Sequence, residues 1–257
     1  MRYLYILFFT FFIFQNAFCI DTLQSIHVPS RADRSRPVRT KIKRVYMIHG
    51  LGADGRLFKN IKLDSSFEVR YVILKVPEKS ENMKTYAQRT LLQIDTTKPF
   101  ALVGVSFGGM VATEISQLVH VEKVVIISSA GTRSELPPRY RFMRRFPVYK
   151  LIPGWFMKAS SFVMQPLFEP DRRKEKTTCN AMLYDKNPLF LKNATRLIIN
   201  WLRTEKPSEI IHIHGTNDHT IPYKNINANH IIQGGSHMMT LTRADEINVL
   251  LDKILLM

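Results

Sequence analysis

Cysteine and acidic residues are both scarce in this chain. Its 257 residues include 2 cysteines, and 21 aspartates and glutamates stand against 37 lysines and arginines, which gives a net charge of +16. Cys19 lies in an N-terminal apolar segment, and if that segment is removed Cys179 is left without an intrachain disulfide partner. Stability must then come from a hydrophobic core, which a chain of this length with 45% hydrophobic residues can form.

The N-terminal apolar segment has the layout of a targeting signal. Arg2 precedes an apolar run from Leu4 to Phe14, and a polar break at Gln15–Asn16 leads to small residues that end at Cys19. This order predicts a secretory signal peptide over residues 1–19. A retained membrane anchor and a lipid-modified cysteine are the alternatives. All three place the protein outside the cytosol, in a periplasm, in the medium or on a membrane.

The basic residues are clustered rather than evenly spread. Two groups stand out: seven Lys or Arg from Arg31 to Arg44, and Arg139, Arg141, Arg144 and Arg145 with Lys150 nearby. One interpretation is attraction to an anionic membrane surface or another polyanion, and the other is solvated loops. No nucleic-acid-binding motif accompanies these charges, which argues against nucleic acid as a partner. Residues 20–43 are predicted to be a basic linker.

From residue 44 onward, short β-rich runs alternate with helical patterns. This rhythm predicts an α/β fold with a mostly parallel, twisted sheet flanked by helices. The expected strands are 44–49, 69–76, 100–105, 123–128, 210–214 and 230–232, and the expected helices are 86–94, 107–119, 189–202 and 244–256. Six prolines between Pro137 and Pro170 interrupt the rhythm, so an insertion is expected between the fourth and fifth strands. No internal repeat is visible.

A serine stands among glycines where an expected strand gives way to a helix, in LVGVSFGGM from Leu102 to Met110. A serine that attacks a carbonyl must project from the sheet edge, which a tight and strained turn between strand and helix achieves. Gly104 and Gly108 give clearance two residues before and two residues after Ser106, and Gly109 leaves the helix further room. The pattern favours a nucleophile over a structural serine.

A serine hydroxyl is a poor nucleophile unless a base takes its proton and an acid orients that base. Asp218 lies in the loop after one expected strand, and His237 lies in a glycine-marked loop after the next. Both would then lie at the sheet edge from which Ser106 projects. His219 is the nearest rival base, but as the neighbour of Asp218 it would point away from that carboxylate.

Acyl transfer also needs backbone N–H groups that stabilise the oxyanion. One is expected from Phe107, directly after the serine. The other is expected from Leu51, in the HGLG turn that follows the first strand. The alternative for HGLG is an ordinary glycine-rich turn.

Four motifs occur in the chain in this order: HGLGADGRLF, GVSFGG, HGTNDHTIP and GGSHMM. Together they resemble the α/β-hydrolase superfamily over residues 44–257. The resemblance implies Ser106 as nucleophile, Asp218 as acid and His237 as base, with residues 132–188 as a helical lid before the aspartate-bearing strand. The short spacing between Asp218 and His237 departs from the family, so the helix between their strands is expected to shrink to a turn. A sheet of about six strands is expected.

The leading hypothesis is a serine hydrolase that cleaves a carboxylic ester of a small molecule through an acyl-enzyme. Thioester, amide and carbon–carbon bonds are alternatives, since the same triad cleaves them, and an insertion rich in Phe, Met and Leu would suit an apolar acyl group. No cofactor is called for, and His212 and His214 share a strand face without an evident third metal ligand. The competing hypothesis is a catalytically inactive, membrane-associated binding or scaffold protein.

Overall fold

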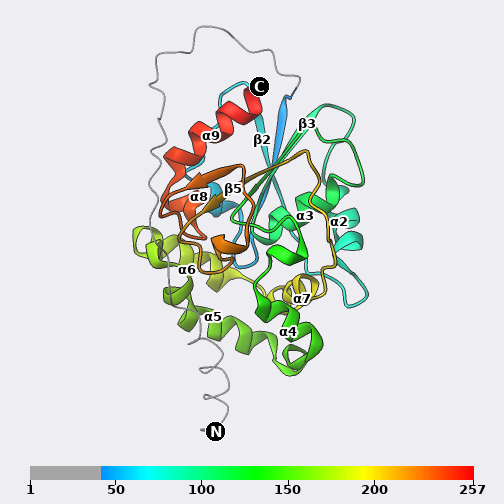
Figure 1. The fold of residues 1–257 in the computed structure, drawn as a ribbon, viewed down its shortest axis with the longest axis vertical. Helices are drawn as coiled ribbons and strands as arrows, with labels where there is room; N and C mark the ends of the chain where they lie inside the picture. Colours follow the sequence, from blue (N-terminus) through cyan, green and yellow to red (C-terminus); the bar gives the residue numbers. More distant parts are fainter. Residues whose placement is uncertain (1–41) are drawn as a thin grey trace. The chain divides into compact units, whose positions relative to one another are not determined.

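The computed structural model describes residues 42–257, except the side chains of residues 167, 168 and 170. The predicted signal segment and nearly all of the basic linker lie outside the described residues. Six strands form one parallel sheet in the order β2-β1-β3-β4-β5-β6 (Figure 1). They are β1 (Arg44–Ile48), β2 (Glu68–Val72), β3 (Phe100–Val105), β4 (Lys123–Ile127), β5 (Ile210–Gly215) and β6 (His230–Ile232).

Helices connect the strands and cover the sheet. The α-helices are α2 (Met83–Leu91), α3 (Phe107–Ile115), α4 (Pro138–Arg145), α5 (Gly154–Phe168), α6 (Lys176–Asp185), α7 (Pro188–Ile199), α8 (Met239–Thr242) and α9 (Ala244–Leu256). Short 3-10 turns are η1 (Gly55–Phe58), η2 (Arg133–Glu135), η3 (Val148–Leu151), η4 (Pro170–Glu175) and η5 (Tyr223–Asn225). No helix among the described residues is both long enough and apolar enough to span a bilayer.

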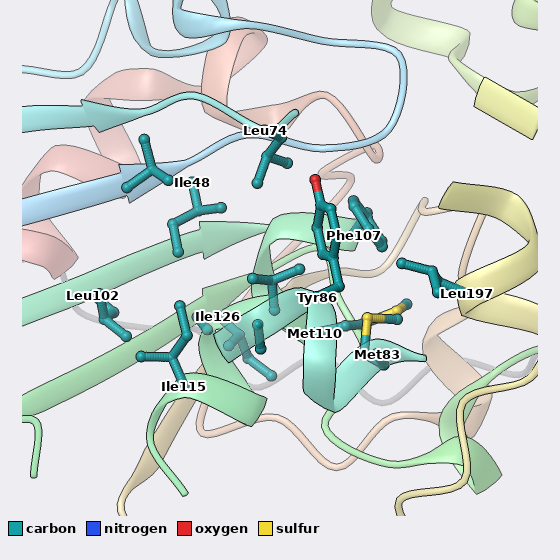
Figure 2. Packing of buried hydrophobic residues seen from close by; sticks show 14 of the residues in the cluster. Ile48, Leu74, Met83, Tyr86, Leu102, Phe107, Met110, Ile115, Ile126 and Leu197 are labelled. Atoms are coloured by element: carbon teal, nitrogen blue, oxygen red, sulfur yellow. The ribbon is translucent and has the colours of Figure 1, made fainter. Parts of the chain in front are cut away.

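Both faces of the central strands β1, β3 and β4 are buried, because successive strand residues point to opposite sides and both sets are apolar. Tyr46 and Ile48 of β1 belong to the cluster that packs under α2, α3 and α7, which Figure 2 shows from close by. Val45 and Met47 belong to the opposite cluster, which includes the inward side of α9. Burial on both faces fixes the register between the strands. The register in turn determines how the carboxyl ends of the strands line up at the edge of the sheet.

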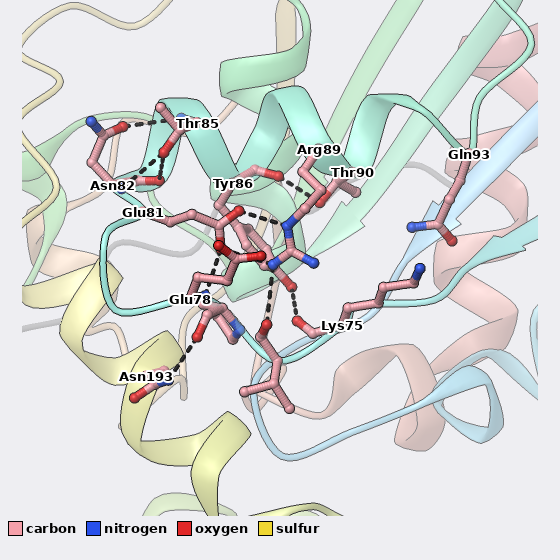
Figure 3. Close-up of polar contacts among 12 residues, drawn as sticks. Lys75, Glu78, Glu81, Asn82, Thr85, Tyr86, Arg89, Thr90, Gln93 and Asn193 are labelled. Carbon is pink, nitrogen blue, oxygen red and sulfur yellow. Dashed lines mark hydrogen bonds and ion pairs between the residues drawn. The ribbon is translucent and has the colours of Figure 1, made fainter.

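Side-chain hydrogen bonds fix the start of α2 and tie it to α7 (Figure 3). Asn82 and Thr85 form a reciprocal capping box, in which each side chain accepts from the backbone N–H of the other residue. The guanidinium of Arg89 donates to the Glu81 carboxylate at 2.6 Å. From α7, the amide of Asn193 donates to the carbonyl of Pro77 at 2.6 Å. Helix α7 is therefore anchored to the loop between β2 and α2.

The expected elements differ from the observed ones mainly at their ends. The expected strand 69–76 stops at Val72 because its partner β1 ends at Ile48, which pairs with Val72. The expected helix 86–94 begins earlier, at Met83, because the capping box at Asn82 starts it there. The helix expected at 107–119 ends at Ile115, and turns follow.

Residues 132–188 are largely helical, as expected for the segment before the aspartate-bearing strand. The chain forms α4, α5 and α6 there, whose individual bounds the proline-broken pattern does not indicate. Buried side chains of α6 and α7, such as Leu183 and Phe190, join the cluster under α2 and α3. Between β5 and β6 the only regular element is the short turn η5, as the spacing of the two motifs indicated.

Candidate active site

Ser106 lies at a strained turn between β3 and α3, at the carboxyl edge of the sheet. Its backbone has φ 54° and ψ −121°, a conformation that residues with side chains rarely adopt. A Cβ on Gly104 would lie 2.5 Å from the carbonyl oxygen of Gly108, and one on Gly108 would lie 2.1 Å from that of Ile48. Only glycine fits at either position, so α3 lies close against both β3 and the end of β1.

The turn is also held from β4. The N–H of Ser106 donates to the carbonyl of Ile127 at 3.0 Å, and the hydroxyl of Ser129 donates to the carbonyl of Ser106 at 2.7 Å. A Cβ on Gly109 would lie 2.4 Å from the Ser129 oxygen, so the third glycine leaves room for this contact. Sequence reasoning did not single out Ser129, because nothing in its local pattern marks it.

The structure brings Ser106, His237 and Asp218 together in one hydrogen-bonded chain. Nδ1 of His237 lies 2.7 Å from Oδ2 of Asp218, and Nε2 lies 2.9 Å from Oγ of Ser106. An ionised carboxylate only accepts hydrogen bonds, so Nδ1 carries the proton and Nε2 accepts from the serine hydroxyl. This is the tautomer that a general base requires.

Asp218 is held in place from three sides. Its Oδ1 accepts the backbone N–H groups of Thr220 at 2.9 Å and Ile221 at 2.8 Å. Nε2 of buried His214 lies 3.5 Å from Oδ2 and 2.9 Å from the carbonyl oxygen of Ile221, to which it donates. These contacts fix the carboxylate that faces His237.

The surroundings of His237 favour its protonated form. Burial acts to lower its pKa, but the charge of Asp218, the hydrogen bond to Asp218 and the charge of Glu169 outweigh burial. The net result is a pKa above the ordinary histidine value of 6.5. Such a shift supports an imidazolium that forms when the base takes a proton.

A second buried carboxylate, Glu169, lies between α5 and η4 close to His237. Its Oε2 accepts the backbone N–H of Met238, the residue after His237, at 3.1 Å. Burial raises the pKa of Glu169 to about 8, against the opposing charge of His237. Sequence reasoning missed this residue, although Glu169 is the first acidic residue after a stretch of 33 residues without one.

The two expected oxyanion donors lie on neighbouring segments. Phe107 is the first residue of α3, where backbone N–H groups have no acceptor within the helix. The HGLG turn passes beside the serine, because a Cβ on Gly50 would lie 3.1 Å from Cβ of Ser106. Leu51 follows directly and packs against the cluster that contains Phe107.

Other histidines near the sheet edge do not belong to the chain of contacts that links Ser106, His237 and Asp218. His49 and His212 are buried, and burial lowers the pKa of the first to about 4 and of the second to about 2. His219 is exposed, and its Nε2 lies 2.9 Å from Oδ1 of Asn217. Within residues 42–257, no three His, Cys, Asp or Glu side chains are grouped so that they could hold a metal ion.

Comparisons with known proteins agree with the observed fold. A sequence model described as "Alpha/beta hydrolase family" matches residues 45–249. Among curated proteins, none matches the chain in sequence. The enol-lactonase from Burkholderia xenovorans superposes with a TM-score of 0.66 at 14% identity, over 84% of this chain and 92% of that one.

Two further solved structures are similar. A lipase-esterase related protein from Clostridium acetobutylicum has a TM-score of 0.58 at 14% identity, over 82% of this chain and 94% of its own. The meta-cleavage product hydrolase from Pseudomonas fluorescens has a TM-score of 0.59 at 18% identity, over 82% of this chain and 90% of its own. At such identities these likenesses show the fold alone.

Proposed function

The chain belongs to the alpha/beta hydrolase family, and we propose that it is a serine hydrolase that cleaves a carboxylic ester or a related acyl bond of a small molecule. Ser106 is the nucleophile, His237 the general base and Asp218 the acid that orients it. Residues 132–188 act as the lid. The observation that carries the proposal is the chain of contacts at 2.9 Å and 2.7 Å that links the three side chains.

Acylation follows from the tautomer of His237. As Oγ of Ser106 attacks the carbonyl carbon, its proton passes to Nε2, and the imidazolium is stabilised by the Asp218 carboxylate. The carbonyl oxygen becomes an oxyanion, for which the N–H groups of Leu51 and Phe107 are the proposed donors. Each well-placed donor is worth about 3 kcal/mol in the transition state. The C–O bond to the leaving alcohol then breaks, and His237 returns the proton to that oxygen.

Deacylation repeats the same steps with water. His237 takes a proton from water, the resulting hydroxide attacks the acyl carbon, and a second oxyanion forms at the same donors. Collapse breaks the bond to Oγ, and Nε2 gives its proton back to Ser106. The products are a carboxylic acid and an alcohol, and the enzyme is restored.

An apolar acyl group is the proposed substrate class. Leu51 packs against a cluster that includes Phe107, Leu183 and Phe190, so apolar side chains from the sheet edge and from the insertion meet beside the proposed oxyanion donors. Apolar side chains gathered at this place favour hydrocarbon over polar substituents. We expect kcat/KM for p-nitrophenyl esters to rise from acetate toward longer acyl chains, and a maximum at acetate would contradict this assignment.

Labelling with a fluorophosphonate tests the function itself. The probe reacts with an activated serine, so the folded protein should be labelled and Ser106→Ala should not. Ser129→Ala is a useful comparison, because this hydroxyl lies close by and donates to the Ser106 carbonyl without any proposed nucleophilic role. Labelling should survive in Ser129→Ala.

A catalytically inactive, membrane-associated scaffold is the second candidate. The net charge of +16 favours it, and the intact hydrogen-bonded chain at Ser106 counts against it. Failure of the folded parent protein to react with the probe would favour the scaffold over the hydrolase.

A further inference from the structure

One stretch of the insertion is basic throughout. Residues 136–168 contain no Asp or Glu, and their six basic residues are Arg139, Arg141, Arg144, Arg145, Lys150 and Lys158. The stretch forms α4, η3 and α5, which Figure 1 shows at the opposite end of the domain from the C-terminal end of α9. Like-charged residues repel one another, so such a segment favours a polyanionic surface.

The same stretch exposes large apolar side chains. Among the described residues, seven of the fifteen large hydrophobic side chains that are exposed lie between residues 142 and 163. Leu151 is 85% exposed and Trp155 is 65% exposed. No residue of α4 is buried. Isolated exposed apolar residues are ordinary, but a cluster of this size marks an interaction surface.

Aromatic and basic side chains are interleaved on this surface. We define the basic-aromatic face by its exposed residues: Arg141, Phe142, Arg144, Arg145, Phe146, Val148, Lys150, Leu151 and Trp155. The rings of Phe142 and Phe146 lie 5.0 Å apart, and the guanidinium of Arg145 lies 5.9 Å from the Phe146 ring. Aromatic and cationic groups are therefore in direct contact on α4, and the other residues of the face follow within ten positions of the chain.

Two side chains next to the face link α4 and η3 to the rest of the domain. The guanidinium of Arg139 donates to the carbonyl of Thr220, in the loop that holds Asp218. The hydroxyl of Tyr149 in η3 is also engaged, accepting from the amide of Asn200 at 3.0 Å. These contacts attach α4 and η3 to the domain, while the residues of the basic-aromatic face stay exposed.

The composition of the face favours lipid over other polyanions. Arg and Lys at the level of lipid phosphates, with Trp and Phe just below, are the side chains that membrane interfaces select. Val148 and Leu151 are aliphatic and cannot stack on nucleobases, whereas they readily enter the hydrocarbon boundary of a bilayer.

We propose that the basic-aromatic face binds the surface of a bilayer that contains anionic lipid. Leu151 and Trp155 enter the interfacial region, while Arg144, Arg145 and Lys150 contact lipid phosphates. The proposal goes beyond the hydrolase function and does not depend on it, because the face contains none of the proposed catalytic residues.

Tryptophan fluorescence gives a readout that is local to this face. The chain has two tryptophans, and Trp201 is buried with its indole N–H donated to Glu114 at 2.9 Å. A change in emission on adding vesicles therefore reports on Trp155. The full chain is mixed with phosphatidylcholine vesicles with and without phosphatidylglycerol. We expect a blue shift, and quenching by lipids brominated on their acyl chains, with the anionic vesicles only.

Matched variants separate the face from the rest of the surface. We measure the lipid concentration at which half of the blue shift is reached. It should rise at least about tenfold in the double variant Arg144→Glu, Arg145→Glu, and also in the single variant Leu151→Ser. Exposed residues elsewhere serve as controls: Lys84→Glu combined with Lys98→Glu, and Leu92→Ser, should leave it unchanged. Trp155→Phe should abolish the shift. Attachment through another segment would not move the emission of Trp155.

Several results would overturn the proposal. They are the absence of a shift with anionic vesicles, an equal shift with phosphatidylcholine alone, and an unchanged response in the arginine double variant. An equal blue shift with a short RNA in place of vesicles would assign the face to nucleic acid. Ser106→Ala should bind vesicles like the parent, so a failed labelling experiment and a failed membrane experiment are distinguishable.

Discussion

At the scale of single residues, the site is a group of polar side chains placed where the sheet ends. Ser106 carries backbone strain, and Asp218 and His237 are buried. Backbone strain and the burial of polar groups each disfavour folding. Hydrogen bonds among Ser106, His237 and Asp218 compensate for them. Strain and buried polar groups are typical of sites where chemistry is done.

Removing the base tests the assignment most directly. His237→Ala should lower kcat/KM for an ester substrate by about 10⁴-fold or more, because Ser106 loses its proton acceptor. The matched control is His219→Ala, since His219 is exposed and lies outside the hydrogen-bonded chain. Near-parent activity in His237→Ala, or a comparable loss in His219→Ala, would move the base to another residue.

The pH profile should reflect the raised pKa of His237. Because only the neutral imidazole accepts the serine proton, kcat/KM should fall as the pH drops through the pKa of His237 in the free enzyme. We expect the midpoint above 6.5, since the charge of Asp218 and the hydrogen bond outweigh burial. Asp218→Asn should lower both the midpoint and the rate. A parent midpoint below 6.5 would contradict the electrostatics described above.

Glu169 should make stability depend on pH. Burial raises its pKa from 4.5 to about 8, so between these values the folded state binds a proton that the unfolded chain has lost. The free energy of unfolding therefore falls as pH rises from about 4.5 to 8. Glu169→Gln cannot ionise, so its Tm should be close to the parent value at pH 4.5 and several degrees higher at pH 9.

Thermal unfolding of both proteins across this pH range checks the prediction. The control is Glu205→Gln, because Glu205 is exposed. Its difference in Tm from the parent should not change with pH. A Glu169→Gln variant that differs from the parent equally at all pH values would mean that folding does not raise the pKa of Glu169.

At the scale of elements, the turn from β3 to α3 depends on the absence of side chains. Gly108→Ala would place a Cβ 2.1 Å from the Ile48 carbonyl, and backbone cannot yield as a flexible side chain can. We expect the free energy of unfolding to fall by about 1–3 kcal/mol or more. Gly52→Ala is the control, since its Cβ would meet only Leu183 at 3.7 Å. Denaturant titration compares the two variants, and equal stabilities would disprove the close approach.

The elements themselves followed from the sequence to differing degrees. Strands 100–105 and 230–232 and helix 244–256 were predicted with their observed bounds. Buried positions in these elements require apolar residues, so the pattern of burial can be recognised in the sequence. The early start of α2 at Met83 was missed, because the Asn82 cap is a local hydrogen-bond effect that the apolar pattern does not register.

At the scale of the whole molecule, the insertion and the sheet share one core. Leu183 of α6 and Phe190 of α7 pack in the same cluster as Ile48 and Leu102 of the central strands. The described domain is therefore expected to unfold as a unit, although residues 132–188 interrupt the alternation of strands and helices.

Leu183→Ala tests this unity. Deleting a buried leucine should lower the stability of the domain by about 2–5 kcal/mol, and far-UV and near-UV circular dichroism should give coincident midpoints. The control is Leu189→Ala, because Leu189 is an exposed leucine at the start of α7. An early, separate transition in Leu183→Ala would show that the insertion unfolds independently.

The sequence by itself determined the fold class and the identity of the three clustered side chains. The sequence shows the apolar strands, the glycines around Ser106, and the order of Ser106, Asp218 and His237. Parallel strands place their carboxyl ends at one edge, so residues that follow different strands are brought to the same place.

Only the tertiary structure decided which further groups surround that chain of contacts. Ser129 holds the Ser106 carbonyl, Glu169 reaches the N–H of Met238, and Arg139 is directed to Thr220. These pairs are separated by 23 to 81 residues and follow no periodic pattern. The contact of Ser129 depends on how the segment after β4 meets the turn after β3, and the contacts of Glu169 and Arg139 depend on how the insertion packs over the sheet edge. Packing between distant elements is a property of the folded chain rather than of any local stretch.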